Sequence, residues 1–118
     1  MDPPCSDLGT LASRPDARWR KSPADIERLA ALQRRMLVRA ARALAPGGTL
    51  VYSTCTVSAR ENESVASAVG EYVDAVETDE LGPEHPPLGS RRDPRFLQLL
   101  PQRDRSTGFF CARFRRRG

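Results

Sequence analysis

Three cysteines are the residues of this chain with the greatest capacity for chemistry, because a thiol can form disulfides, bind metals or attack carbon. Cys5, Cys55 and Cys111 are spread over 118 residues. An odd number without CxxC spacing argues against both a disulfide framework and a zinc site. His85 is the only histidine, and no cluster of metal ligands accompanies it. The pattern therefore predicts reduced thiols and no bound metal.

Two of these cysteines follow segments that are typical of strand ends. Cys55 comes after the uncharged, β-prone run Thr49–Thr54, which predicts a buried parallel strand. Cys5 ends a loop-like segment that begins directly after Met1. Open α/β sheets bind ligands beyond the carboxyl ends of their strands, so the two thiols would face one pocket if the strands are neighbours. Taken alone, each is more often a small buried apolar residue, as we also expect for Cys111.

A long amphipathic helix must lie between these two cysteines. Ser22 is a good N-cap, Pro23 follows at the first helical position, and Asp25 lies in the first turn. Pro46-Gly47-Gly48 ends the helix. The apolar stripe consists of Ile26, Leu29, Ala30, Met36, Leu37, Ala40, Ala41 and Leu44. Opposite it lies a basic face made of Arg28, Arg34, Arg35, Arg39 and Arg42.

The rest of the chain continues as an α/β protein. Ser58 and Glu61 form a capping-box pattern for a second helix that ends near Asp74, with Val65, Val69, Tyr72 and Val73 on its apolar side. Residues 79–95 are rich in proline, glycine and charge and predict a loop. Phe96–Leu100 and Gly108–Phe114 predict two strands of an antiparallel hairpin, joined through Gln102–Thr107. Strand and helix in alternation predict one α/β domain, which is only partial, over residues 1–118.

Charge and composition limit the class of protein. The formal net charge is +4, and residues 14–42 hold nine basic and three acidic side chains. Arg113–Arg117 forms a second basic cluster. Guanidinium groups bind phosphate well, so the distribution favours a nucleic-acid partner, although a GC-rich genome would also enrich arginine. No apolar run is long enough to cross a bilayer and no leader opens the sequence, so we expect a cytoplasmic protein.

Several motifs carry a resemblance to a known family. Asp2-Pro3-Pro4-Cys5-Ser6-Asp7-Leu8-Gly9 is similar to the Asp-Ala-Pro-Cys-Ser-Gly-x-Gly motif of the Sun/Fmu family of RNA cytosine-5 methyltransferases. The family's other motifs follow in order: Arg14-Pro15-Asp16 with Trp19, the Pro23 helix, Pro46-Gly47-Gly48, Tyr52-Ser53-Thr54-Cys55-Thr56, Glu61-Asn62-Glu63 and Gly108-Phe109-Phe110. The resemblance spans nearly the whole chain. It is closest to the branch that methylates small-subunit ribosomal RNA.

The resemblance implies a role for each thiol. Carbon-5 of cytosine is a poor nucleophile, and attack of a thiolate on carbon-6 activates it for transfer of a methyl group from S-adenosyl-L-methionine. In the family this nucleophile corresponds to Cys55, and Cys5 corresponds to the cysteine that assists release of the adduct. Asp2 matches the motif acid that lies near the cofactor and the base, although an acid here can also cap a turn. Pro3 and Asp7 depart from the family's alanine and glycine.

The resemblance also implies that part of the enzyme is not in this sequence. The eight glycines are scattered, and none forms the glycine-rich turn that holds S-adenosyl-L-methionine in the family. We therefore expect the C-terminal half of a Rossmann-like methyltransferase sheet that ends in an antiparallel hairpin. Such a chain is expected to be inactive alone and to need an N-terminal half or a partner chain.

Two alternatives remain open at this point. The first is a non-catalytic RNA-binding fragment or remnant, since the chain keeps its basic helix and lacks the cofactor turn. Asp2-Pro3-Pro4 is also similar to the acid-proline-proline motif of amino-group methyltransferases. That chemistry places an aromatic residue where Cys5 stands and has no use for Cys55. Trp19 could stack on an RNA base or pack over the helix. His85 is expected to be exposed to solvent and to have no functional role.

Overall fold

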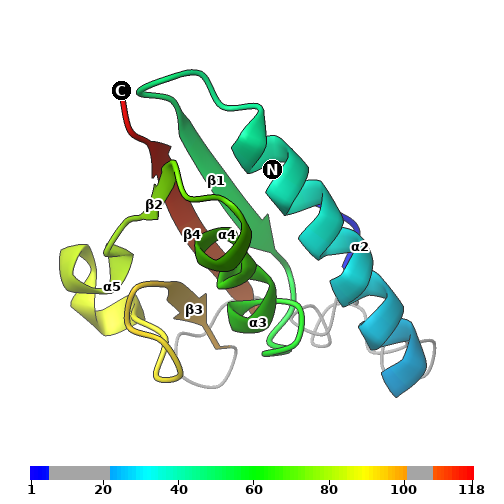
Figure 1. Ribbon diagram of the computed structural model, residues 1–118. Helices are drawn as coiled ribbons and strands as arrows, with labels where there is room; N and C mark the ends of the chain where they lie inside the picture. The colour runs from blue at the N-terminus through cyan, green and yellow to red at the C-terminus, as the bar shows by residue number, and fades with distance from the viewer. Residues whose placement is uncertain (6–21, 101–107) are drawn as a thin grey trace.

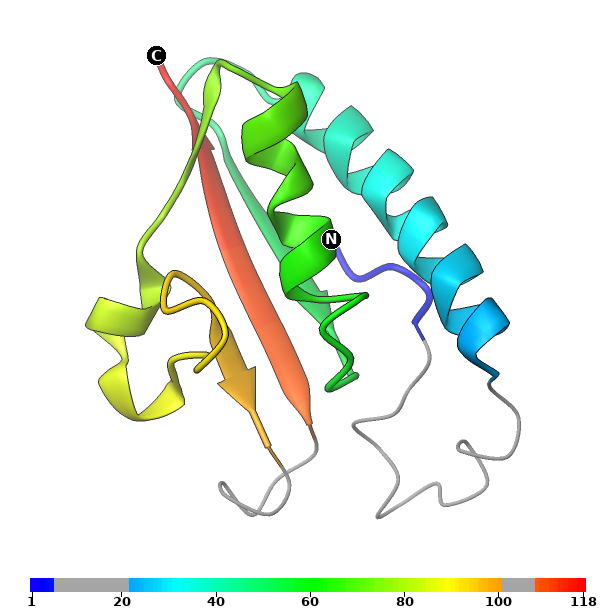
Figure 2. The same ribbon diagram turned by 60° about the horizontal axis from the view of Figure 1, so that its bottom comes forward.

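A four-stranded antiparallel sheet with helices on one face forms the framework of the protein (Figures 1 and 2). The computed structural model describes residues 1–5, 22–100 and 108–118. The strands are β1 (Thr49–Thr54), β2 (Val76–Thr78), β3 (Leu97–Leu99) and β4 (Phe109–Arg116). β4 pairs with β1 along one edge, and with β2 and β3 at opposite ends of its other edge. The α/β fold class predicted from the sequence is confirmed.

Strand β1 lies where the sequence predicts it, but its surroundings differ from the prediction. It pairs antiparallel with β4, and only one of its faces is buried, with Tyr52 and Thr54 pointing toward the helices. On the opposite face, Val51 is 41% exposed and Phe109 of β4 is 37% exposed. The prediction of a buried parallel strand was therefore wrong for this pairing. Alternation of buried and exposed residues is the pattern of an antiparallel sheet that is covered on one side.

The edge of β1 that faces away from β4 nevertheless makes a parallel contact with Met1. The Met1 amino group donates to the Val51 carbonyl at 2.5 Å, and the Met1 carbonyl accepts from the Ser53 amide at 3.0 Å. Met1 thus bonds to Val51 and to Ser53, the two neighbours of Tyr52. This is the hydrogen-bond pattern of parallel strands. The segment that leads to Cys5 thus runs beside the strand that leads to Cys55, which meets the condition set from the sequence for the two thiols to face one pocket.

Helix α2 (Pro23–Arg42) closely follows its sequence signals. The Ser22 side chain accepts from the Asp25 amide, and the Asp25 carboxylate accepts from the Ser22 amide, which completes a capping box. The helix ends two residues before Leu44, the last residue of the predicted stripe. Arg116 of β4 donates to the Leu44 carbonyl at 2.7 Å and so ties this end of the helix to the sheet.

The second predicted helix exists as two short ones, α3 (Glu63–Ala66) and α4 (Ala68–Tyr72). The predicted capping box does not form, because the Ser58 carbonyl, and not its side chain, accepts from the Glu61 amide. The Glu61 side chain is fully buried against α2. Tyr72 was predicted on the apolar side but is 57% exposed. α2 and the α3–α4 pair lie side by side on the same face of the sheet (Figure 2).

The C-terminal part confirms the hairpin and corrects the loop. β3 and β4 pair antiparallel as predicted, with Leu97 opposite Cys111. Their predicted connection, Gln102–Thr107, lies outside the described residues. The predicted loop over residues 79–95 contains α5 (Leu81–Glu84) and the short 3-10 helix η2 (Pro86–Leu88), and strand β2 was not predicted at all. These elements are only three or four residues long, too short to produce a periodic signal.

Candidate functional site

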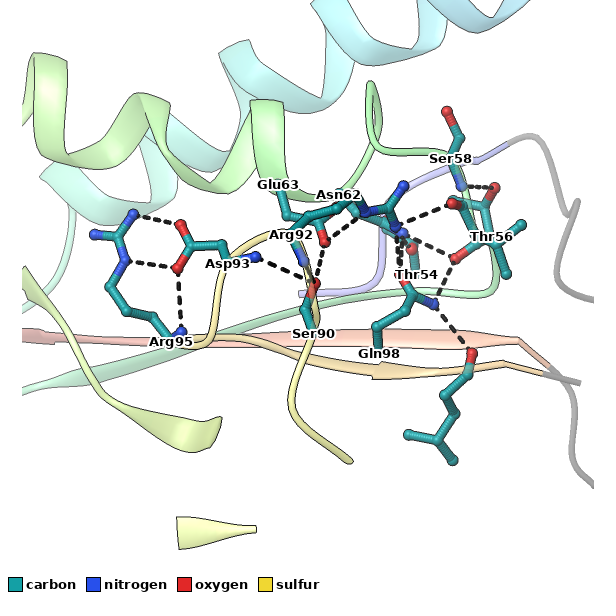
Figure 3. Close-up of polar contacts among 12 residues, drawn as sticks. Thr54, Thr56, Ser58, Asn62, Glu63, Ser90, Arg92, Asp93, Arg95 and Gln98 are labelled. Atoms are coloured by element: carbon teal, nitrogen blue, oxygen red, sulfur yellow. Dashed lines mark hydrogen bonds and ion pairs between the residues drawn. The ribbon is translucent and has the colours of Figure 1, made fainter. Parts of the chain in front are cut away.

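The segment that carries Cys55 is held on both sides by one buried side chain. Thr54 and Thr56 flank Cys55 and are fully buried. Thr54 Oγ1 donates to Asn62 Oδ1 at 2.6 Å, and Asn62 Nδ2 donates to the Thr56 carbonyl at 2.9 Å (Figure 3). Cys55 itself remains partly exposed. Asn62 therefore fixes the backbone on either side of the thiol without covering it.

Gln98 of β3 extends this network into the hairpin. Its Oε1 accepts from Asn62 Nδ2 at 2.9 Å, and its Nε2 donates to the Thr56 carbonyl at 3.4 Å (Figure 3). The same Nε2 also donates to the Phe109 carbonyl at 3.0 Å. Gln98 is almost completely buried. Hydrogen bonds in such a dry setting are strong, and an unpaired group there is costly. The Cys55 segment is consequently attached to β3 and β4 as well as to its own strand.

A second set of buried contacts holds the segment that carries Cys5. Gln33 Nε2 of α2 donates to the Pro4 carbonyl at 2.8 Å and to Glu61 Oε1 at 3.1 Å. The Tyr52 hydroxyl of β1 donates to the Glu61 carbonyl at 2.7 Å. Gln33, Glu61 and Tyr52 are fully buried. The residue before Cys5 is therefore fixed, through Gln33, to the residue next to Asn62.

Two adjacent residues thus tie both cysteine segments together. Glu61 holds the Cys5 side through Gln33, and Asn62 holds the Cys55 side through Thr54 and Thr56. We call residues 61 and 62 the Glu61-Asn62 pair. Parallel pairing of Met1 with β1 brings the same two segments out at one edge of the sheet. A rigid frame of this kind is what a site with two reactive groups requires.

The local electrostatics distinguish the buried hydroxyl and the third cysteine. Burial, followed by the nearby charges of Glu61 and Cys5, raises the pKa of Tyr52, so its phenol remains a proton donor to the Glu61 carbonyl. Burial also raises the pKa of Cys111, and this effect outweighs the opposing one of Arg113. A thiol with a raised pKa is a poor nucleophile. This agrees with the packing role predicted for Cys111 in the middle of β4.

The remaining predicted residues lie as follows. Each of the three cysteines is a partly buried thiol outside any disulfide bond. Asp2 is exposed, between the paired Met1 and the buried Pro3, and His85 is exposed as well. Residues 6–11, which complete the first cysteine motif, as well as Arg14-Pro15-Asp16 and Trp19, lie outside the described residues.

Within the described ranges, no three His, Cys, Asp or Glu side chains come together as a metal site. Nor is any helix in those ranges long and apolar enough to cross a membrane.

The basic face of α2 borders a surface groove. Its members are all exposed, and Arg28 pairs with Asp25. The groove has a volume of about 340 Å³ and is lined by Arg34, Arg35, Val38, Arg39, Arg42 and Tyr72. The predicted second basic cluster is different, because acidic partners compensate Arg113, Arg115 and Arg117. Among the described residues, the positive charge of the helix is therefore less compensated by acids than that of the second cluster.

Sequence reasoning missed the polar frame of the site. Glu61 was interpreted as part of a capping box, Asn62 appeared only within a motif, and neither Gln33 nor Gln98 was singled out. One signal was present in the sequence. Gln33 occupies a position between Ala30 and Leu37 where the apolar stripe of the helix should contain another apolar residue. A polar residue on a buried helical stripe needs a partner.

Comparison with known proteins gives a consistent result. The family model described as 16S rRNA methyltransferase RsmB/F matches residues 1–115. "Ribosomal RNA small subunit methyltransferase F" of Salmonella typhi is 45% identical over 118 residues, which cover 98% of this chain and 25% of the relative. The chain thus spans a quarter of the length of that curated relative.

Two solved structures share the fold. The crystal structure of PH0851 has a TM-score of 0.87 and 31% identity, over 96% of this chain and 25% of that one. NSun6 from Pyrococcus horikoshii, solved with SFG, has a TM-score of 0.80 and 30% identity, over 98% of this chain and 29% of that one. With two thiol segments held at one sheet edge and a family match over nearly its whole length, the chain belongs to the 16S rRNA methyltransferase RsmB/F family.

Proposed function

We propose that this chain forms the thiol-bearing part of an enzyme that transfers a methyl group from S-adenosyl-L-methionine to carbon-5 of a cytosine in ribosomal RNA. The observation that carries the proposal is the Glu61-Asn62 pair, which ties the segments of Cys5 and Cys55 to one frame. Reactions that use two groups in succession need both to be oriented toward the same substrate. The family match and the ribosomal RNA methyltransferase relatives support the choice of substrate.

In the proposed mechanism Cys55 is the nucleophile. Its thiolate forms a bond to carbon-6 of cytosine while the double bond between carbons 5 and 6 opens, which places the electron pair on carbon-5. S-adenosyl-L-methionine supplies the electrophilic methyl group that carbon-5 takes. Loss of the carbon-5 proton then restores the double bond and breaks the bond from sulfur to carbon-6, which returns the Cys55 thiolate. Cys5 is proposed to assist this release.

The described residues fit the cofactor only in part. Asp2 is an exposed carboxylate at the same sheet edge as the cysteine segments, where it can accept hydrogen bonds from hydroxyl or amino groups. NSun6 from Pyrococcus horikoshii was solved with SFG, an analogue of S-adenosyl-L-methionine, which supports the choice of cofactor. The glycine-rich turn has no counterpart in these 118 residues. The rest of the pocket is proposed to come from a further segment of the protein or from a partner chain.

The 118 residues by themselves are expected to bind S-adenosyl-L-methionine very weakly, because Asp2 alone provides little of a cofactor pocket. Isothermal titration calorimetry on the purified chain measures this directly. A chimera in which the chain replaces the matching quarter of the Salmonella typhi relative should restore binding and serves as the control. Micromolar affinity of the isolated chain would contradict the expectation.

The basic face of α2 is expected to supply RNA affinity that depends on salt and not on sequence. Arg34, Arg35 and Arg39 are exposed, and changing all three to glutamine should make the plot of log affinity against log salt shallower by about two. Fluorescence anisotropy with a single-stranded RNA at several salt concentrations measures the slope. Arg115→Gln with Arg117→Gln is the matched control, because these arginines already pair with acids. An unchanged slope in the helix variant would favour genome composition as the origin of these arginines.

A further inference from the structure

A small pocket lies directly beside the segment that carries Cys55. It has a volume of about 260 Å³ and is lined by Val57, Ser90, Arg91, Arg92, Gln98 and Leu100. Val57 is two residues beyond Cys55, and its carbonyl accepts from Arg92 Nη2 at 3.2 Å. Gln98 is the side chain that holds the Thr56 carbonyl. The pocket, called here the flanking pocket, therefore shares two of its walls with the frame around the proposed nucleophile.

The walls of the flanking pocket combine apolar surface with guanidinium groups. Val57 and Leu100 are partly exposed and present apolar contact area. Arg91 is exposed, and in the described part of the chain it forms no ion pair. Guanidinium groups bind phosphate and stack on bases, and apolar side chains pack against base faces. This mixture suits a nucleotide better than an acidic peptide, which would leave the apolar wall unused.

The pocket is rigid because buried contacts hold the turn over residues 90–92. Ser90 Oγ donates to Glu63 Oε2 at 2.6 Å, and Arg92 Nε donates to the same oxygen at 3.2 Å (Figure 3). Arg92 Nη2 also donates to Gln98 Oε1 at 3.3 Å. The Glu63 side chain is only 10% exposed. Arg92 is thereby held in place by Glu63, whereas Arg91 at the rim has no acidic partner among the described residues.

The size of the pocket limits its occupant to a single unit. Sites for drug-sized ligands usually measure about 300–1,000 Å³, and this pocket is slightly smaller. One base with its sugar or phosphate fits that volume, and a longer stretch must continue outside it. Val57, which lines the pocket, lies two residues beyond Cys55 along the chain. An RNA whose target cytosine contacts Cys55 therefore has its neighbouring nucleotide near the pocket.

We propose that the flanking pocket binds the nucleotide next to the target cytosine in the RNA strand. The base packs against Val57 and Leu100, and Arg91 contacts the adjoining phosphate. This assignment rests on the proposed function, because it takes the Cys55 thiol as the position of the target base. The pocket then fixes the position of the RNA along the enzyme. The nucleotide next to the target cytosine thereby becomes part of substrate recognition.

The test combines changes in the protein with changes in the RNA. The 118-residue chain is titrated by fluorescence anisotropy with short single-stranded RNAs that contain one cytosine, either intact or with an abasic nucleotide beside that cytosine. Removal of the neighbouring base should weaken binding about tenfold in the unaltered chain. In the Leu100→Ala variant, removal of the same base should reduce the RNA affinity by a clearly smaller factor. Arg91→Gln should weaken binding to the intact RNA several-fold and make the salt dependence shallower by about one.

Arg117→Gln is the matched control for charge, because Arg117 is exposed and pairs with Glu77 at the far end of β4. The inference is overturned if the abasic penalty is the same in Leu100→Ala, if Arg91→Gln behaves like Arg117→Gln, or if the chain binds neither RNA. Covalent capture of a cytosine analogue by the chimera separates the two proposals. If the chimera captures the analogue but the abasic RNA binds as tightly as the intact RNA, only the flanking-pocket proposal is wrong. If the abasic RNA binds more weakly but no capture occurs, the cytosine-5 chemistry is wrong and the pocket remains an RNA-binding subsite.

Discussion

Cys55→Ser is expected to abolish both RNA methylation and covalent capture of RNA in the chimera with the Salmonella typhi relative. A serine hydroxyl is far less nucleophilic than a thiolate unless a base activates it strongly. The substitution is nearly isosteric, and Thr54 and Thr56 remain held by Asn62, so the fold around position 55 should persist. Methylation is measured by transfer of labelled methyl groups, and capture by denaturing gels with an RNA that contains a trapping cytosine analogue.

Cys5→Ser is expected to produce the opposite result on the gel. Methyl transfer can still occur once, but release of the adduct slows, so a covalent complex between the protein and RNA with ordinary cytosine, which needs no trapping analogue, should accumulate and resist denaturation. The two substitutions thus separate attack from release, although both remove one thiol from the same sheet edge. Accumulation of the adduct with Cys55→Ser instead of Cys5→Ser would reverse the roles proposed for the two cysteines.

Cys111→Ser provides the matched control for these substitutions. Cys111 is also a partly buried free thiol, but it lies in the middle of β4, and burial raises its pKa. A general requirement for thiols, or sensitivity of the fold to the change, would therefore appear in this variant as well. If all three variants methylate RNA normally, the cysteines only fill the core and the mechanism proposed here is wrong. RNA binding by the isolated chain without covalent capture by the chimera would favour an RNA-binding role.

Local signals predicted those elements that depend on local chemistry. The start of α2 follows from Ser22, Pro23 and Asp25, whose capping contacts involve residues no more than three apart. The β3–β4 hairpin likewise pairs strands that are close in sequence. The pairing of β1 with β4 joins residues about sixty positions apart, and no local pattern reports such a contact. This is why β1 was predicted to be buried on both faces and is covered on only one.

The same distinction applies to the site. The position of Cys55 directly after a strand could be predicted, because it depends on where β1 stops. For Cys5 the described residues show only the pairing of Met1 with β1, four residues earlier. The contacts between Gln33, Glu61, Asn62 and Gln98 could not be predicted, because each joins separate elements of the fold. A buried polar side chain gains from its partners only after the tertiary structure has removed water. Gln33 on the apolar stripe was the one residue whose type conflicted with its local pattern.

Two acceptors in this frame still lack donors within the described part of the protein. Gln33 Oε1 and Glu63 Oε1 are buried and accept no hydrogen bond there. The two residues stand on either side of the Glu61-Asn62 pair, one contacting Glu61 and the other next in sequence after Asn62. Buried oxygens are nearly always satisfied in folded proteins by protein groups or by ordered water. The frame therefore keeps two buried acceptors, near both cysteine segments, that are not satisfied by the described residues.

Asn62→Asp is expected to lower the free energy of unfolding by about 2–4 kcal/mol at neutral pH, because the substitution is isosteric but removes both Nδ2 donors. The ionised carboxylate would face the Thr56 carbonyl and Gln98 Oε1, which both accept from Asn62 in the native protein. Burial beside acceptors disfavours the charged form, so the pKa of this aspartate should rise on folding. Its penalty should then be small below the unfolded pKa of about 4 and should grow as the pH rises through the folded value.

Urea unfolding of the native chain and of Asn62→Asp between acidic and neutral pH measures that difference directly. Ser64→Asp is the matched control, since Ser64 lies two residues further along α3 and is exposed, so its carboxylate should titrate normally and produce no such slope. In the chimera, Asn62→Asp should also slow covalent capture while leaving Cys55 present, because the backbone on either side of the thiol loses its restraint. A stability difference that is constant with pH would mean that residue 62 reaches solvent. Unchanged capture would mean that the Glu61-Asn62 pair stabilises the fold without orienting Cys55.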